Sequence, residues 1–273
     1  MQLMRYNTRN DHPLTLAFIG DIQWIGKPEL IAYNHFKDYL VEANQKDAMY
    51  IGMGDYTDFA SPSNRKALAG SGLYDTAKDV IRTAAKTVVD GLYADLLSPT
   101  TGRWLAMLEG HHYLQLEGQT TDQYLAELLG APFAGTCCNL HLEFSHGKHT
   151  GSIDVWLHHG PARMVQNPAN YLQTKVFPYW DAHIFAMGHV PKIESKVLDR
   201  VYTVYTKGVG RLQHREVRVI GTGGWAKAYI EGTLRGDYAE QAMYSPASLG
   251  APMVEIEPRW ENGSWDPMIK VVL

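Results

Sequence analysis

Short apolar runs that stop on a glycine recur through the first two thirds of the chain. They are LTLAFIG (14–20), AMYIGMG (48–54), WLAMLEG (104–110), DVWLHHG (154–160) and AHIFAMG (182–188). Apolar runs of this length, bounded by glycine, predict buried β-strands.

Longer segments with a helical spacing of apolar residues lie between these runs. They cover 28–45, 74–97 and 120–130. In the last of them, Thr120 or Thr121 is a candidate N-cap and Gly130 a candidate C-terminal stop. The alternation of strands and helices predicts an α/β layered fold in which helices cover a sheet.

The last third of the chain has a different pattern. Segments 196–208, 215–225 and 252–260 alternate apolar and polar residues like antiparallel strands, with turn residues between them. They predict a second sheet packed against the first. No Pro/Gly/Ser-rich linker, charge block or repeat divides the sequence, so we expect a single domain over 1–273, with the last third supplying most of the second sheet.

The composition is that of a soluble globular enzyme, with 45% apolar and 20% charged residues. A net charge of −4 gives no general attraction to nucleic acid or to an anionic membrane. No apolar run approaches the roughly 18–20 residues of a membrane span, and the N-terminus has no secretory signal pattern. The two cysteines, Cys137 and Cys138, are adjacent and form no disulfide framework. We therefore expect a cytoplasmic protein without membrane contact.

Each of the five predicted strands delivers a residue of metal-ligand type at its carboxyl end, next to a glycine. These residues are Asp21, Asp55, His111 with His112, His158 with His159, and His189. Ligands of open α/β sheets bind outside the carboxyl ends of the strands, and glycine lets the backbone approach a shared centre. The pattern predicts one functional site at that edge of the sheet.

The motifs GDIQ, GDYTD, EGHHY, HHGPA and GHVP, in this order from Gly20 to Pro191, resemble the five motifs of the calcineurin-like metallophosphoesterases. Together with HHGPARMVQNPANYLQ and GTGGWAKAY, they look most like phage- or prophage-type members. The resemblance implies a four-layer α/β/β/α sandwich of two mixed β-sheets flanked by helices. It also implies two divalent metal ions, bridged by an aspartate, that hydrolyse phosphate esters.

The resemblance assigns metal ligands residue by residue. Asp55 matches the carboxylate that bridges the two ions, and Asp21 matches a ligand of the first ion. Gln23 stands where the family usually has His, and an amide oxygen is a weaker ligand than imidazole for Zn or Fe. His111 stands where the family has Asn, a ligand of the second ion, and His189 matches the first histidine of GHxH, which also binds the second ion.

His158 and His159 compete for one ligand position, and the family pattern, which places the ligand directly before glycine, favours His159. Pro191 stands where the second histidine of GHxH would bind the first ion. The first ion therefore lacks two imidazoles, whereas the second keeps a complete set. We expect one tight site and one weak, water-rich site, with Mn²⁺ favoured and Mg²⁺, Zn²⁺ or Fe as alternatives. Residues that could complete the weak site are His183, His214 and Asn167.

Further roles concern proton transfer and phosphate binding. His112 matches the histidine that, in the family, donates a proton to the leaving oxygen. Asp58, at the last position of the GDxxD motif, is the candidate that orients His112. Arg163 follows the HHGPA turn and is a candidate for holding a phosphate oxygen.

These assignments predict a metal-dependent phosphoesterase that favours phosphodiesters. The substrate would be a phosphorylated small molecule, a nucleotide or a nucleic acid, in the host cytoplasm if the protein is phage-encoded. Segment 58–97 would overhang the site as a lid or groove, and aromatic residues, including those of VFPYWD (176–181), could stack on a base.

Two alternatives remain open. One is a DNA nuclease of the same fold, which requires a basic strip from Arg65 to the centre and which the negative net charge disfavours. The other is a degenerate member that binds phosphorylated ligands or a protein partner without turnover. Pro191 favours this second alternative, whereas His112 argues against it, since a pure binder needs no general acid.

Overall fold

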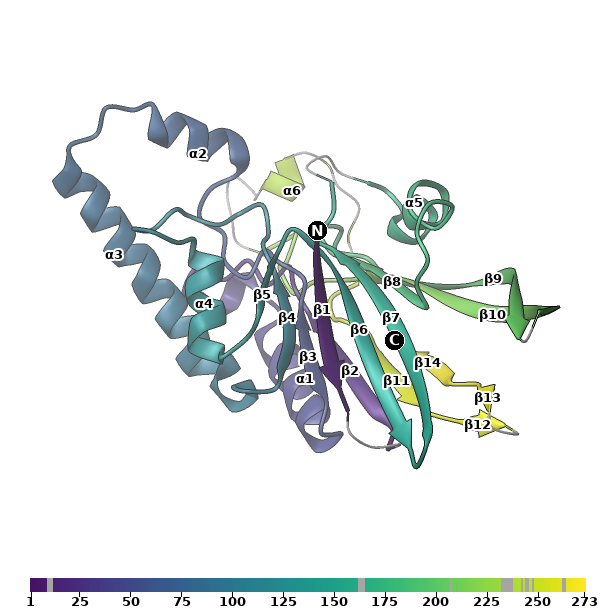
Figure 1. The fold of residues 1–273 in the computed structure, drawn as a ribbon. Helices are drawn as coiled ribbons and strands as arrows, with labels where there is room; N and C mark the ends of the chain where they lie inside the picture. The colour runs from purple at the N-terminus through teal and green to yellow at the C-terminus, as the bar shows by residue number, and fades with distance from the viewer. Residues whose placement is uncertain are drawn as a thin grey trace.

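Two six-stranded mixed sheets form the body of the protein (Figure 1). The computed structural model describes residues 1–8, 12–161, 165–206, 208–231, 238–241, 243, 246, 248–261 and 264–273. The first sheet has the order β14-β11-β2-β3-β4-β5, and the second β1-β6-β7-β8-β10-β9.

The strands of the first sheet are β2 (Leu14–Ile19), β3 (Met49–Gly52), β4 (Trp104–Leu108), β5 (Phe133–Gly135), β11 (Met253–Glu257) and β14 (Met268–Val272). Those of the second sheet are β1 (Gln2–Asn7), β6 (Cys137–His146), β7 (His149–His158), β8 (Ile184–Met187), β9 (Ile193–Thr206) and β10 (Val209–Thr222). A small hairpin joins β12 (Trp260–Glu261) to β13 (Ser264–Trp265).

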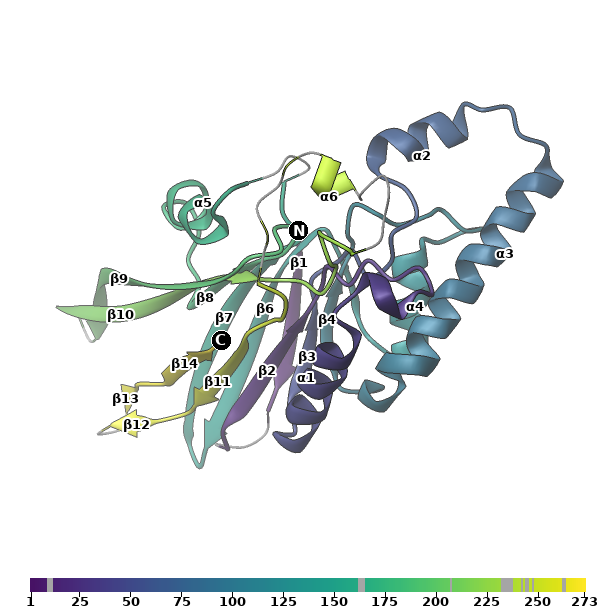
Figure 2. The same ribbon diagram turned by 180° about the vertical axis from the view of Figure 1, so that it is seen from behind.

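The two sheets pack face to face through side chains such as Phe18 and Ile51 of the first sheet and Leu140 and Val155 of the second. Helices α1 (Tyr33–Gln45), α3 (Asp75–Leu92) and α4 (Thr121–Leu129) cover the outer face of the first sheet. Helix α5 (Pro168–Lys175) covers part of the outer face of the second (Figure 2). The predicted four-layer α/β/β/α arrangement of two mixed sheets is therefore confirmed.

The five apolar runs predicted as strands are β2, β3, β4, β7 and β8. Strands β2, β3 and β4 pair in parallel, and so do β7 and β8. Their carboxyl ends consequently lie at one edge of each sheet, as the sequence predicted. The helical segments are confirmed too: the Thr120 side chain caps α4 in a capping box with Gln123, and Gly130 ends the helix with φ 63°.

The last third of the chain contributes to both sheets. Strands β9 and β10 form a long antiparallel hairpin beside β8 in the second sheet. Strand β11 lies between β2 and β14 in the first sheet, antiparallel to both. A short helix, α6 (Tyr238–Gln241), falls between these two groups of strands.

Segment 58–97, expected to overhang the site as a lid or groove, is mostly helical, and helix α2 (Pro62–Ala69) lies in its first half, where no helix was predicted. Helix α2 begins where the Ser61 side chain accepts a hydrogen bond from the Asn64 amide at 3.3 Å, with Pro62 at the first helical position. Helix α2 has no buried residue, and the buried residues of α3 lie only in its second half (Ala85, Val89 and Leu92). Helix α2 and the start of α3 thus form an arm that stands away from the sheets (Figure 1).

Shorter turns complete the chain: a 3-10 turn at Pro28–Leu30, a π turn at Tyr93–Leu97 and another 3-10 turn at Ser98–Thr100. Among the described residues, no helix is both long enough and apolar enough to cross a membrane.

Candidate metal centre

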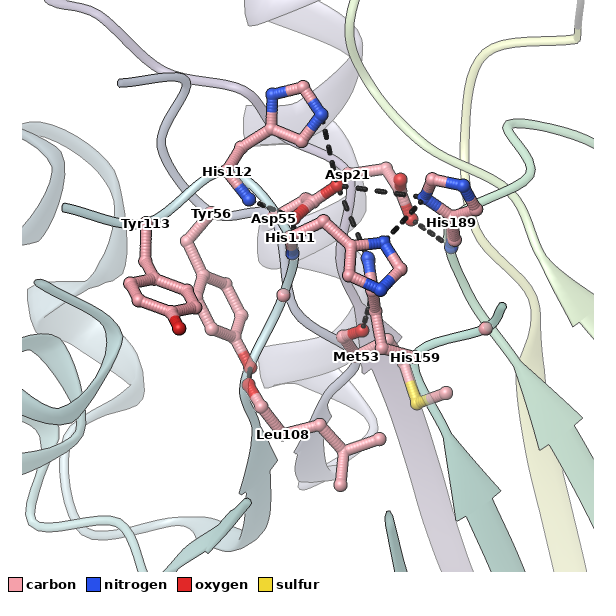
Figure 3. Close-up of polar contacts among 12 residues, drawn as sticks. Asp21, Met53, Asp55, Tyr56, Leu108, His111, His112, Tyr113, His159 and His189 are labelled. Atoms are coloured by element: carbon pink, nitrogen blue, oxygen red, sulfur yellow. Dashed lines mark hydrogen bonds and ion pairs between the residues drawn. The ribbon is translucent and has the colours of Figure 1, made fainter. Parts of the chain in front are cut away.

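Four side chains from four strand ends converge at the shared edge of the two sheets (Figure 3). Asp55 follows β3 and His111 follows β4 in the first sheet, whereas His159 follows β7 and His189 follows β8 in the second. One candidate ligand atom from each of the four lies within 4.8 Å of all the others. These are the four residues that the sequence assigned to the second ion, and the structure brings them together.

The contacts inside this cluster are close. Nε2 of His159 lies 3.2 Å from Oδ2 of Asp55, and Nδ1 of His189 lies 3.9 Å from the same oxygen. Nδ1 of His111 is 3.2 Å from Nδ1 of His189. The other nitrogen of His159, Nδ1, donates to the carbonyl oxygen of Met53 at 2.6 Å, so Nε2 faces the cluster.

Two of the cluster's atoms have no hydrogen-bond partner among the described residues. They are Oδ2 of Asp55 and Nε2 of His159, and each belongs to a side chain that is 1% exposed. Buried polar atoms are nearly always hydrogen-bonded. Two buried ligand-type atoms 3.2 Å apart, neither of them hydrogen-bonded, are therefore suited to share a bound cation. One carboxylate and three imidazoles form a donor set typical of a first-row divalent metal ion. The residues present therefore fit such an ion.

The charges of the cluster are strongly coupled. Burial alone would lower the pKa of His159, but the nearby Asp55 carboxylate, Asp21 and the hydrogen bond to the Met53 carbonyl oxygen outweigh burial and raise this pKa to about 9. Burial would raise the pKa of Asp55, and the neighbouring histidines reverse this effect, so that its pKa falls well below the ordinary value. Burial and the nearby imidazoles lower the pKa of His111 to about 4. His111 is thus neutral at pH 7, as a ligand must be, whereas His159 would give up its proton when an ion binds.

Asp21 lies beside this cluster without belonging to it. Its Oδ2 accepts a hydrogen bond from the His189 backbone amide at 2.9 Å. Burial, opposed by His159, raises the pKa of Asp21 to about 7. Gln23 is held through its backbone, whose amide donates to the Asp55 carbonyl oxygen at 3.0 Å.

Pro191 lies on the Asp21 side of the centre. A Cβ built on Gly224 would fall 2.7 Å from Cβ of Asp21 and 3.4 Å from Cβ of Pro191. Where the family pattern would place an imidazole, the chain therefore offers a proline ring, which has no ligand atom. Among the described residues, the four-residue cluster is the one group of side chains close enough together to hold a metal ion, and Asp21 is not part of it.

The backbone at the centre is held in an unusual conformation. Asp21, Gln23, Asp55 and His189 have φ values between 48° and 63°, in the left-handed region that costs a residue other than glycine about 1–3 kcal/mol. A Cβ built on Gly110 would fall 2.1 Å from the Asp55 amide nitrogen. Strain and glycine contacts of this kind cluster at functional sites, because the surrounding fold must hold them in place.

His112 and Asp58 form a hydrogen-bonded pair at the rim of the cluster. Nδ1 of His112 lies 2.6 Å from Oδ1 of Asp58, and Nε2 of His112 lies 3.9 Å from Oδ2 of Asp55. Burial would lower the pKa of His112, but the hydrogen bond that His112 donates to Asp58 and the charges of Asp55 and Asp58 raise it overall. The structure thus places Asp58 where it orients His112 and favours the protonated ring.

Other predicted residues lie away from the cluster. The ring of His158 stacks on Trp156, and its Nδ1 accepts from the Gly160 amide at 2.8 Å, so it faces the outer side of the sheet. His158 is therefore not the member of the doublet that joins the cluster. Arg163 lies outside the described residues.

The three residues proposed to complete the weak site do not do so. His183 precedes β8 and accepts from the Asp154 amide, at the strand end opposite the cluster. His214 is exposed on the β9–β10 hairpin. Asn167 caps α5 by accepting from the Asn170 amide at 2.8 Å. Strand position directs the side chains of His183 and His214 elsewhere, and helix capping engages that of Asn167.

The aromatic residues expected near the site and the basic residue that a nuclease would require there have other contacts in the structure. Phe177 packs edge-on against Phe185, and Trp180 lies near Trp156, on the outer face of the second sheet. Arg65 does not extend a basic strip, since its guanidinium is bound to backbone carbonyl oxygens.

Two residues that support the centre were not predicted. Asp122, in the first turn of α4, is buried and accepts from the Gly110 amide at 2.9 Å. Burial raises the pKa of Asp122 to about 7, despite the hydrogen bond. Arg65, in α2, contacts the backbone of the turn that carries His111 and His112. The sequence shows Asp122 as an acidic residue in the first turn of a predicted helix, but nothing in the sequence predicts its contact with Gly110.

Comparisons with known proteins give a limited result. No family profile matches the chain, and no curated protein matches it. Among solved structures, the chain is similar to a single mutant of Vps29 from Entamoeba histolytica, with 13% identity, a TM-score of 0.34, and 95% of this chain and 100% of that chain covered. Vacuolar Protein Sorting 29 from Cryptosporidium parvum is similar with 12% identity, a TM-score of 0.34, and 96% and 99% covered. Scores this low carry no functional argument, so the function must be inferred from the site.

Proposed function

We propose that this protein is a metal-dependent phosphoesterase of the calcineurin-like type. One observation carries the proposal: a buried cluster of one carboxylate and three imidazoles lies next to a histidine–aspartate pair. A metal-binding group and an oriented proton donor, side by side, are the two parts that hydrolysis of a phosphate ester needs. The wording of EGHHY, HHGPARMVQNPANYLQ and GTGGWAKAY supports the assignment to phage-type members, and we propose further that the protein acts in the cytoplasm.

The cluster would hold one ion through Asp55, His111, His159 and His189. A second ion would find Asp21, Gln23 and the shared Asp55, with a proline at the remaining position. We therefore propose one tight site and one weak site, with Mn²⁺ as the favoured ion. When bound, a divalent ion would supply Lewis-acid chemistry: it would polarise the phosphoryl group and lower the pKa of water, so that hydroxide is available near neutral pH.

The chain's own residues supply proton transfer and orientation. Asp58 holds Nδ1 of His112, which leaves Nε2 directed toward the space beside Asp55. From there the Nε2–H of His112 donates its proton to the leaving oxygen as the phosphorus–oxygen bond breaks. The raised pKa of His112 favours the protonated ring, which is the form that this step requires.

We propose phosphodiesters as the favoured substrates, among phosphorylated small molecules, nucleotides and nucleic acids. The acidic net charge and the engagement of Arg65 with carbonyl oxygens argue against a DNA nuclease. A protein that only binds phosphorylated ligands would not require the His112–Asp58 pair.

The proposal is tested by assaying bis-p-nitrophenyl phosphate, p-nitrophenyl phosphate, and linear and circular DNA with Mn²⁺, Mg²⁺, Zn²⁺ or a chelator. We expect hydrolysis of the diester with Mn²⁺, its loss on chelation, and a fall in kcat on the order of a hundredfold or more in His112→Ala. His149→Ala is a matched control, since His149 is exposed at the opposite end of β7.

Activity that survives both chelation and His112→Ala would refute the mechanism. A protein that binds the metal, by elemental analysis, yet hydrolyses none of the substrates would support the binding alternative instead. Cleavage of DNA without cleavage of the small esters would support the nuclease.

A further inference from the structure

We infer that Arg65 is a positioning residue, whose guanidinium holds the His111–Tyr113 turn in the conformation that aims His111 and His112 into the centre. The effect on metal binding and turnover rests on the function proposed above, whereas the effect on the turn does not. Arg65 lies in α2, outside every motif that predicted the site.

The guanidinium binds the turn from its carbonyl side. Nη1 of Arg65 donates to the carbonyl oxygens of His111 and of Tyr113, the latter at 3.2 Å, and also to that of Ala60 at 2.6 Å. The carbonyl oxygen between them, that of His112, accepts from the amides of Phe59 and Ala60 at 2.9 and 3.3 Å. Segment 59–65 thus binds three consecutive carbonyl groups of the turn.

The amide side of the same turn is bound by carboxylates. Oδ1 of Asp55 accepts from the amides of His111 and His112, the latter at 2.9 Å. Oδ2 of Asp122 accepts from the amide of Gly110. The turn is therefore clamped between acceptors on one face and donors on the other, and Arg65 provides the charged donor.

The clamp determines where two side chains point. His111 and His112 are neighbours, yet the ring of His111 faces His189 while the ring of His112 faces Asp58. Adjacent side chains diverge in this way only while the backbone between them keeps one conformation. If the turn relaxed, the ring of His111 would leave the cluster and that of His112 would leave Asp58.

Arginine suits this position for two reasons. Its planar guanidinium lies 3.7 Å from the ring centroid of Tyr113, where it stacks while it donates hydrogen bonds. Lysine has a compact ammonium group without a planar face, so it cannot stack on the Tyr113 ring in this manner. The helix start fixes the donor, since Ser61 caps α2 and Pro62 occupies its first turn.

The experiment compares Arg65→Gln and Arg65→Lys with Lys66→Gln. Lys66 is the next residue of α2, carries the same charge and is exposed, so its loss changes the charge of the helix without touching the turn. The first readout is amide hydrogen exchange at His111 and His112 in metal-free protein. We expect exchange to accelerate on the order of tenfold to a hundredfold in Arg65→Gln, less in Arg65→Lys, and not in Lys66→Gln.

The second readout is the binding of Mn²⁺ and Zn²⁺ by calorimetry, together with kcat and KM for bis-p-nitrophenyl phosphate. We expect weaker ion binding and a lower kcat, with KM little changed, in Arg65→Gln. Millimolar guanidinium should partly restore both in Arg65→Ala, and tetramethylammonium should not, because only guanidinium can both donate and stack.

Unchanged exchange at His111 and His112 in a folded Arg65→Gln would overturn the inference. If Arg65→Gln does not fold, the test uses Arg65→Lys. Amide exchange at His111 and His112 that equals that of Lys66→Gln overturns the inference, and faster exchange supports it. If the protein neither binds metal nor hydrolyses any ester, the proposed function fails, while hydrogen exchange still tests the clamp.

Discussion

The two histidines of the EGHHY motif do different work although they are neighbours. His111 joins the buried cluster as a neutral imidazole, whereas His112 stands at its rim with a raised pKa and a carboxylate partner. The environment of each ring, rather than its chemistry, separates a ligand from a proton donor.

This separation predicts different consequences for two substitutions. His111→Asn keeps a neutral ligand but replaces nitrogen by an amide oxygen, so it should shift metal preference from Zn²⁺ toward Mn²⁺ or Mg²⁺. His112→Ala leaves the cluster intact and should lower kcat with little change in metal affinity. Calorimetric titration with each ion and steady-state kinetics check both; equal effects of the two substitutions on both quantities would refute the division.

Asp58 should set the pH range of activity. The proton donor works only while His112 is protonated, so activity falls as pH rises through the pKa of His112. Because Asp58 helps to raise this pKa, Asp58→Asn should lower it and move the alkaline limb of the kcat profile to lower pH. The exposed Asp38→Asn is the control, and a limb that stays in place would show that Asp58 does not tune His112.

At the scale of elements, the sequence predicts those site residues that directly follow a strand and misses those that reach the site from a helix. Residues such as Asp55 and His189 directly follow buried strands, so a strand pattern and a ligand type suffice to place them. Arg65 and Asp122 act through helices that meet the turn only in the folded chain, and no local pattern shows such a contact. Helix α2 was not predicted, because it buries none of its residues and so carries no apolar stripe that would mark a helix in the sequence.

Helix α4 brings a prediction about stability. Asp122 links its first turn to Gly110, and burial raises the pKa of this carboxyl from an ordinary value near 4 to about 7. The folded protein therefore binds a proton more tightly than the unfolded chain, and its stability falls as pH rises from about 4 to about 7. The contribution is on the order of 1.4 kcal/mol per pH unit within this window.

Asp122→Asn keeps an oxygen acceptor for the Gly110 amide and removes the titration. Its free energy of unfolding should lack this fall, so that its stability relative to the native protein improves as pH rises from about 4 to about 7. Urea unfolding of both proteins at several pH values measures the difference. Parallel stability curves would contradict a raised pKa at Asp122.

At the scale of the whole molecule, the centre belongs to both sheets. Asp55 and His111 are carried by the first sheet, and His159 and His189 by the second. An ion bound by all four would join the sheets and stabilise the folded state by mass action, by about 2.7 kcal/mol at a hundred times its Kd. We expect Mn²⁺ or Zn²⁺ to raise Tm by several degrees in the native protein and in His158→Ala.

His159→Ala should lose this rise, because it removes a ligand of the cluster while its neighbour His158 lies outside it. Differential scanning calorimetry with and without the ion makes the comparison. A rise in Tm that survives in His159→Ala would place the ion elsewhere.

The hydrogen bond from the His189 amide to Asp21 joins residues 168 positions apart. No partly folded chain that contains only one sheet can assemble this centre, so during folding it forms after the two sheets have docked. An ion that binds there would bind after the folding transition state, so it would lower the unfolding rate and leave the folding rate nearly unchanged. The lifetime of the protein in a cell would then follow the supply of metal, with the ion-free form the first to be degraded when metal is scarce.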